Sequence, residues 1–119
     1  MIWRIRSKRV FGQLGAGGHR VTSGPVRLTY VALPSAHPQL AMAIGRRFGN
    51  AVERNRARRR VRRAFAAAWE TTGGPEGAYL VTGSRSLLSM PFDALVSRLG
   101  DCLERCAAIR SSEIGSATI

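Results

Sequence analysis

Lysine is almost absent from this chain, although the chain is strongly basic. Lys8 is the only lysine among 19 basic residues, and seven acids oppose them, so the formal net charge is +12 and the isoelectric point is near 11.7. Arginine presents a planar fork of donors that binds phosphate through two hydrogen bonds and stacks on bases. The bias therefore favours a nucleic-acid partner, although a GC-rich genome would also favour arginine over lysine.

Long apolar segments are missing as well. The longest uninterrupted apolar runs are 40–44 and 64–69, and both are far shorter than the roughly 20 residues that cross a bilayer. The basic N-terminus carries no apolar stretch of the kind that a secretory signal needs. We therefore expect no membrane partner, and we expect a cytoplasmic protein. A chain of 119 residues is long enough for one compact domain and too short for two.

Residues that perform hydrolytic chemistry are sparse and scattered. The seven acids are dispersed along the chain, whereas a nuclease that works through its own metal ions needs clustered carboxylates. His19 and His37 lie in separate segments bounded by glycine or proline, without a carboxylate beside them. Neither a phosphate-binding GxxxxGK motif nor a GxSxG motif occurs. The sequence therefore predicts no catalytic residues and no metal site.

Cysteine is limited to Cys102 and Cys106, and neither histidine nor further cysteine accompanies them at the spacing of metal ligands. On a helix the two thiols share one stripe with five apolar residues, which are Phe92, Leu95, Val96, Leu99 and Leu103. We predict that both are buried core thiols. Redox chemistry and a disulfide on the helix surface are the alternatives.

Apolar periodicity and turn residues predict one domain over residues 1–110. The expected elements are a short helix (7–14), two tightly paired strands (20–33), a buried strand (40–45), a long helix (50–70), a strand (78–83) and an amphipathic helix (91–109). Residues 111–119 show no periodicity. We expect them to form a frayed tail.

One segment carries half of the positive charge. Residues 46–63 have the sequence RRFGNAVERNRARRRVRR, with nine arginines and a single acid, Glu53. Asn50 and Glu53 have the spacing of a capping box, which places the start of the long helix at Asn50. Opposite the apolar side of this helix lies a polar arc formed by Asn55, Arg56, Arg59, Arg60, Arg62 and Arg63. Because unpaired guanidinium groups are costly to bury, we expect this arc to face outward and bind a polyanion, rather than remain a solvated helix face.

The string over 37–65, HPQLAMAIGRRFGNAVERNRARRRVRRAF, resembles the central signature of the bacterial ribonuclease P protein component. In that signature an apolar strand, two basic residues, a helix start similar to Gly-Asn-Ala-Val and an Arg-Asn-Arg core follow in this order. Here the core is Arg54-Asn55-Arg56. The resemblance implies an α+β fold, a single-domain α/β sandwich with a four-stranded mixed sheet. It also implies the element order αβββαβα and a left-handed βαβ crossover, as in a domain of a ribosomal protein.

By the same resemblance the chain would be the small subunit of a ribonucleoprotein that removes the 5′ leader of precursor tRNA. The RNA subunit would be the catalyst, with its own bound Mg²⁺. The residues implied to bind this RNA are Arg46, Arg47, Arg54, Asn55, Arg56, Arg58, Arg59 and Arg62, with the anion-attracting helix start at Asn50. Phe11 and Tyr30 are implied to stack on leader bases in a cleft between the first helix and the sheet. Plain core packing is the alternative for both.

The implied partners are ribonuclease P RNA, with one protein per RNA subunit, and precursor tRNA. A basic residue that is usual at the end of the family's fourth strand corresponds to Arg85, or to Ser84 if no gap is allowed. A free-standing RNA-binding or ribosomal-type protein is the alternative function, since it would explain the charge without the ordered signature. A nuclease that acts alone is a third class, and the dispersed acids count against it.

Overall fold

The computed structural model describes residues 3–4, 18–32 and 38–117, with side chains described over 18–32, 38–45 and 47–110. The expected first helix, which includes Phe11, lies outside these residues. The described elements are β1 (Trp3–Arg4), β2 (His19–Ser23), β3 (Val26–Ala32), β4 (Gln39–Met42), η1 (Arg46–Phe48), α2 (Ala51–Thr72), β5 (Gly77–Gly83), α3 (Ser86–Ser89) and α4 (Phe92–Ala117).

The strands form one mixed sheet in the order β1-β4-β5-β3-β2. Strands β2 and β3 form the expected hairpin, and β3 pairs with β5 in the antiparallel direction. Strands β4 and β5 are parallel neighbours joined by α2, so they form a βαβ crossover. The four longer strands are the predicted mixed sheet. The two-residue β1 adds to its β4 edge, and a strand this short leaves no periodicity in a sequence.

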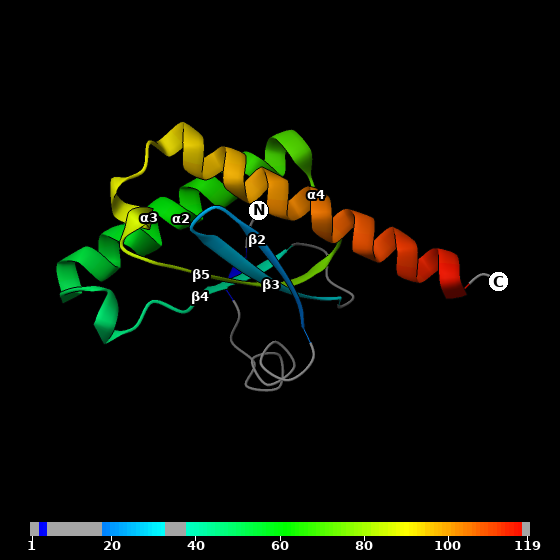
Figure 1. Ribbon diagram of the computed structural model, residues 1–119, viewed down its shortest axis with the longest axis horizontal. Coiled ribbons are helices and arrows are strands. Elements are labelled where there is room, and N and C mark those ends of the chain that lie inside the picture. Colours follow the sequence, from blue (N-terminus) through cyan, green and yellow to red (C-terminus); the bar gives the residue numbers. More distant parts are fainter. Residues whose placement is uncertain (1–2, 5–17, 33–37, 118–119) are drawn as a thin grey trace.

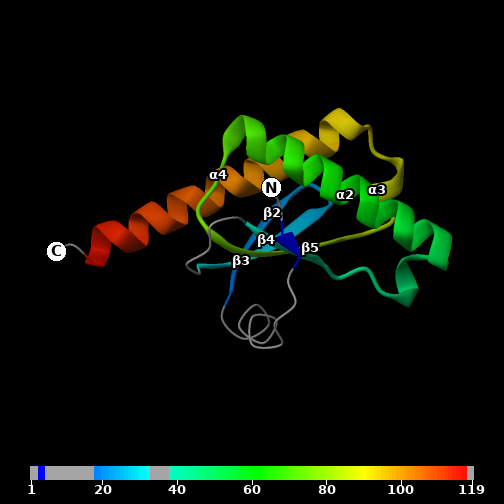
Figure 2. The ribbon, with the colours of Figure 1, turned by 180° about the vertical axis from the view of Figure 1, so that it is seen from behind.

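Helices α2 and α4 lie side by side on one face of the sheet, as both views in Figures 1 and 2 show. Strand β3 explains why this face is covered. Val26, Leu28 and Tyr30 alternate with more exposed residues and are buried in the core against the helices. The opposite face of β3 carries Arg27 and Thr29. The sheet therefore has one apolar, helix-covered face and one polar face.

Four aromatic rings fill the end of the core where α2 leads into β5. Tyr30 and Tyr79 lie 5.1 Å apart, centroid to centroid, and Phe65 lies 5.3 Å from Tyr79 and 6.0 Å from Trp69. The Tyr30 hydroxyl donates a 2.9 Å hydrogen bond to the Glu76 carbonyl. The Tyr79 hydroxyl donates to the Pro75 carbonyl. The two buried tyrosines thereby satisfy their hydroxyls and fix the α2–β5 loop to the sheet.

Helix α2 begins as its sequence predicts. The Asn50 side chain accepts a 2.9 Å hydrogen bond from the Glu53 amide, and the Glu53 carboxylate accepts a 3.1 Å bond from the Asn50 amide. This is a complete capping box. At the other end, Gly73 has a φ of 66° and donates its amide to the Trp69 carbonyl at 2.8 Å. The helix therefore ends at Thr72, just before this glycine and two residues after the predicted Glu70.

Three features of the helices differ from the sequence-based expectation. The final helix α4 does not end near Ile109 but continues to Ala117, so 111–117 have a helical backbone rather than forming part of a frayed tail. The apolar stripe ends before that point, but no proline follows to stop the helix. The short helices η1 and α3 were also not predicted, because three or four residues are too few to show a helical period.

Cys102 and Cys106 are free, fully buried thiols in the core, as predicted. Burial raises the pKa of Cys102 to about 11 and that of Cys106 to about 12. The thiolate is the reactive form of cysteine, so a buried thiol with a raised pKa is chemically inert. The two residues therefore belong to the packing of α4 and not to a redox or metal site.

We expect both thiols to resist alkylation in the folded protein at about pH 8 and to react on unfolding. Because burial raises both pKa values, the thiols stabilise the fold below their ordinary pKa near 8.5. That contribution is lost as the pH rises through about 11 to 12. Mass spectrometry of iodoacetamide adducts with and without denaturant measures this. Rapid labelling of the folded protein would contradict the burial of the thiols.

We expect Asn50→Ala to lower the free energy of unfolding by about 1 kcal/mol, because it removes the acceptor for the Glu53 amide. Asn50→Ser is the matched control, since serine keeps an acceptor at the cap without changing the charge. Urea denaturation of the three proteins measures the difference. Equal stability of the alanine and serine variants would show that the cap contributes nothing.

Candidate nucleic-acid interface

Helix α2 separates its residues into a buried side and a charged side. The buried residues are Ala57, Val61, Ala64, Phe65 and Ala68, which pack in the core. Around the rest of the helix stand the arginines that we call the arginine surface: Arg54, Arg56, Arg58, Arg59, Arg62 and Arg63. Within the described part of the chain, the one ion pair is formed by Glu53 and Arg85, so no acid neutralises this surface. It is a row of positive charge on a rigid support.

Two residues of the arginine surface also bind backbone carbonyls nearby. Arg58 donates to the Ile44 carbonyl at 3.2 Å and to the Asn55 side chain at 3.3 Å. Arg54 donates through its Nε to the Asn50 carbonyl at 3.4 Å. Because a guanidinium group has five N–H donors, these bonds orient both side chains and leave donors for a ligand. The structure therefore brings the predicted residues Arg54, Asn55 and Arg58 together at the start of α2.

The segment before α2 is fixed by Arg85, a residue that follows β5. Arg85 donates to the Phe48 carbonyl at 3.0 Å and pairs with the carboxylate of Glu53. The hydrogen bond from Arg85 is the main cause that lowers the pKa of Glu53. A Cβ on Gly49 would lie 2.6 Å from the Glu53 Oε1 atom and 2.8 Å from the Arg85 Nη1 atom. A side chain at position 49 would therefore displace the ends of these two side chains and disturb the clamp that they form.

The clamp positions two further predicted residues, Arg46 and Arg47, which belong to η1. The Arg47 side chain is exposed, and the Arg46 side chain lies outside the described side chains. Arg85 was not among the predicted site residues. The resemblance did indicate this residue, because a basic residue usually ends the family's fourth strand, which corresponds to β5 here. Its observed contacts show that it holds η1 against the start of α2.

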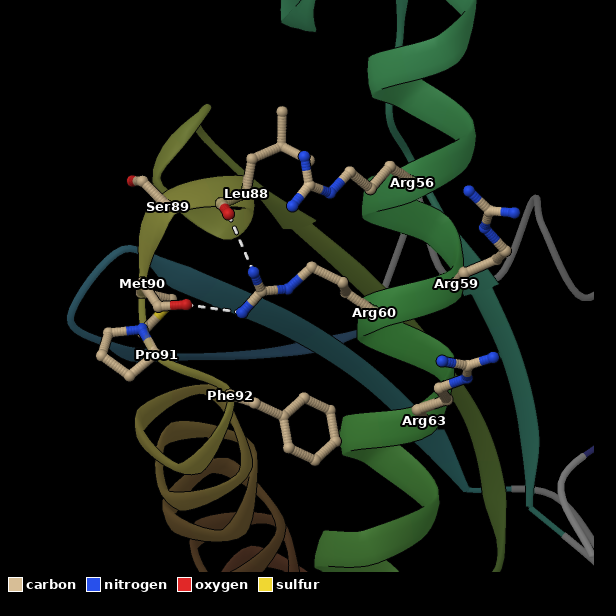
Figure 3. Close-up of a pocket in the computed structure, with 9 residues that line it drawn as sticks. All are labelled: Arg56, Arg59, Arg60, Arg63, Leu88, Ser89, Met90, Pro91 and Phe92. Carbon is tan, nitrogen blue, oxygen red and sulfur yellow. Dashed lines mark hydrogen bonds between the residues drawn. The ribbon is translucent and has the colours of Figure 1, made fainter.

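Arg60 does not belong to the outward arc in which the sequence placed it. The side chain is partly buried and donates to the Leu88 carbonyl at 2.8 Å and to the Met90 carbonyl (Figure 3). Arg60 therefore ties α2 to the link between α3 and α4. The helical wheel missed this role because it treats α2 in isolation, and the four-residue α3 was not predicted.

Tyr30 is not placed to stack on a leader base. Its side chain is 0% exposed and lies in the core between β3 and the helices. Core packing, the alternative for this residue, is what the structure shows. In the sequence, Val26, Leu28 and Tyr30 stand at alternate positions, which indicates a common face with the core residues, whereas the family resemblance implied a place for Tyr30 in the cleft. Phe11 lies outside the described residues, so its role stays a prediction.

The polar face of the sheet carries a second basic surface, which is concave. A groove of about 520 Å³ lies over β2, β3 and β5. Strand register aligns its side chains in two rows, Arg20-Thr29-Leu80 and Thr22-Arg27-Thr82. We call this surface the sheet groove. Arg20 and Arg27 are exposed and supply positive charge, while Leu80 gives the groove an apolar floor.

Metal and membrane sites have no support in the part of the chain that the structure describes. There, no three His, Cys, Asp or Glu side chains gather to hold a metal ion. Of the helices in the same residues, none is both long and apolar enough to span a bilayer. The two basic surfaces can neutralise phosphates, and the described side chains around them form no metal-binding cluster.

Comparison with known proteins identifies the family. Residues 2–107 match the model of the Ribonuclease P family. The ribonuclease P protein component of Symbiobacterium thermophilum is 30% identical over 110 residues, which cover 91% of this chain and 94% of that protein. The corresponding protein of Coprothermobacter proteolyticus is 34% identical over 89 residues, covering 73% of this chain and 70% of that one.

Solved structures show the same fold at lower identity. The ribonuclease P protein of Thermotoga maritima superimposes with a TM-score of 0.72 at 22% identity, covering 86% of this chain and 96% of that one. The ribonuclease P protein of Staphylococcus aureus gives a TM-score of 0.68 at 20% identity, with coverages of 91% and 94%. Since the family model spans nearly the whole sequence and full-length relatives agree with it, the chain belongs to the ribonuclease P protein family.

Proposed function

We propose that this chain is the protein subunit of ribonuclease P, which binds the catalytic RNA and the 5′ leader of precursor tRNA and so promotes 5′ maturation of tRNA. The arginine surface of α2 is the observation that carries the proposal. Its charges stand on one helix without acid partners among the described residues. Such a surface gains affinity for RNA by releasing counterions from the phosphates.

The geometry of α2 suits a structured RNA. Helix α2 has 22 residues and is therefore about 33 Å long. Arginines recur along its first four turns, from Arg54 to Arg63. The helix start is held by its capping box and by the Arg85 clamp. A rigid row of donors loses little conformational entropy when it binds, which favours a specific phosphate pattern over loose attraction.

The chemistry of cleavage would belong to the RNA subunit and its Mg²⁺. The described residues gather no donor cluster that fits a metal ion, so we place Mg²⁺ on the RNA. The role of the protein would be electrostatic, since its arginines reduce the repulsion between the RNA subunit and the precursor. We further propose one protein per RNA subunit and a cytoplasmic location.

We assign the leader of the precursor to the sheet groove. Arg20 and Arg27 would bind leader phosphates, and Thr29 and Thr82 would offer hydroxyls beside them. Contacts to the phosphate backbone of the leader suit leaders of varied sequence, because such contacts do not select bases. Phe11 remains the predicted stacking residue. This assignment replaces Tyr30, which is buried on the other face of the sheet.

We expect Arg59→Ala to weaken binding of a bacterial ribonuclease P RNA by about tenfold at low salt, because one charged phosphate contact is lost. The slope of log affinity against log salt should fall by about 0.7 to 0.9. Arg98→Ala is the matched control, since it removes one exposed arginine from α4 instead of α2. Filter binding across a salt series measures both values. Equal losses in the two variants would refute a specific α2 interface.

The same proteins should be assayed for cleavage of precursor tRNA at limiting Mg²⁺, with and without the RNA subunit. We expect stimulation with the RNA and no cleavage by the protein alone. Cleavage without the RNA subunit would favour a nuclease that acts by itself. RNA binding without stimulation would favour a free-standing RNA-binding protein.

We expect Arg27→Ala to lower the affinity of the reconstituted enzyme for precursor tRNA by about tenfold, with no change for mature tRNA, because a phosphate contact to the leader is lost. Tyr30→Phe is the control for the corrected assignment. It removes the hydrogen bond to Glu76 and should lower the melting temperature without changing leader affinity. Competition binding with both tRNAs measures these effects. A loss of leader affinity in Tyr30→Phe at unchanged stability would restore Tyr30 to the cleft.

A further inference from the structure

A basic groove lies between α2 and the link from α3 to α4, apart from the sheet groove. It has a volume of about 710 Å³. Arginines of α2 line one wall, and the segment from Leu88 to Phe92 lines the other (Figure 3). We call it the α2–α4 groove. Its far wall depends on Arg60, which donates to the carbonyls of Leu88 and Met90 and so holds that segment in place.

Phe92 is the unusual residue in this groove. It is the first residue of α4, and 42% of its surface is exposed, although it shares the apolar stripe of that helix. Figure 3 shows the ring between the first turn of α4 and α2, near Arg60 and Arg63. A large exposed aromatic ring beside guanidinium groups is the combination with which proteins bind single-stranded nucleic acid, by stacking a base and neutralising its phosphates.

We propose that the α2–α4 groove holds one unpaired nucleotide of the RNA subunit, with its base stacked on Phe92 and its flanking phosphates bound by Arg59 and Arg63. This inference rests on the proposed function. Arg60 is a positioning residue here, since its two terminal nitrogens donate to backbone carbonyls. Both phosphate-binding residues are exposed, and neither has an acidic partner in the described part of the chain.

Continuity with the arginine surface identifies the RNA subunit as the occupant. Arg56 and Arg59 belong to the arginine surface and also line the groove. An RNA strand that binds the start of α2 therefore reaches the groove without leaving the helix. The sheet groove, which we assign to the leader, lies on the opposite face of the sheet. An acidic peptide would satisfy the arginines as well, but it would leave the Phe92 ring without a stacking partner.

The test measures affinity of full-length variants for a bacterial ribonuclease P RNA. We expect Phe92→Ala to weaken binding by about fivefold to a hundredfold, the range for one stacked base. Phe92→Leu should be equally weak because it keeps apolar bulk without an aromatic face, and Phe92→Trp should bind like the wild type. The salt slope should stay unchanged in all three. Arg63→Ala should lower the slope by about 0.7 to 0.9.

Photocrosslinking from a benzoylphenylalanine at position 92 in the assembled enzyme should mark an unpaired nucleotide of the RNA subunit.

Melting temperatures of the variants check that each one folds. Wild-type affinity in Phe92→Leu, or crosslinks to precursor tRNA alone, would overturn the groove assignment. If Arg59→Ala weakens RNA binding but all Phe92 variants bind normally, only the groove assignment fails. If the wild type does not bind the RNA at all, the proposed function fails.

Discussion

The apolar contact between α2 and the sheet decides where the positive charge of this protein lies. Three alanines, Ala57, Ala64 and Ala68, are fully or almost fully buried on the inner side of the helix, whose backbone lies close to α4, while Phe65 packs on Tyr79 of the sheet. A buried guanidinium without a partner costs on the order of several kcal/mol, so the arginines of α2 are excluded from this contact. Hydrophobic burial on one side thereby sets the orientation of the side that we propose to bind RNA.

Two groups of arginines with different contacts stand outside that apolar contact. Arg58, Arg60 and Arg85 donate to backbone carbonyls of neighbouring segments and hold the loops around α2 in place. Arg56, Arg59 and Arg63 have no such bond among the described residues and stand free for a ligand. The helix fixes the spacing of the second group, and the first group fixes the segments around the helix. The unbound protein retains the mutual repulsion of the free group. A bound polyanion would relieve this repulsion and would therefore also stabilise the fold.

How far the sequence predicts this structure depends on whether a feature is local. The capping box at Asn50 and Glu53, the hairpin and the buried thiols follow from spacings within one element, and all three are confirmed. Arg60 depends on α3, which is too short to leave a period in the sequence, so its inward contact was not predictable. Tyr30 was misassigned despite a correct local signal, because the alternation of β3 gave its face and the family resemblance outweighed it.

The two-layer architecture would allow one small domain to hold the two proposed RNA segments without competition between them. The helices occupy one face of the sheet (Figures 1 and 2), and the sheet groove is lined by side chains of the other face. Successive residues of β3 point to opposite faces of the sheet: Tyr30 packs in the core beneath the helices, and its neighbour Thr29 lines the sheet groove. A substrate strand bound at Arg27 would therefore remain free while α2 is covered by RNA. If the proposed assignments hold, segregation of the two sites by strand alternation would let the protein contact the RNA subunit and the precursor at the same time.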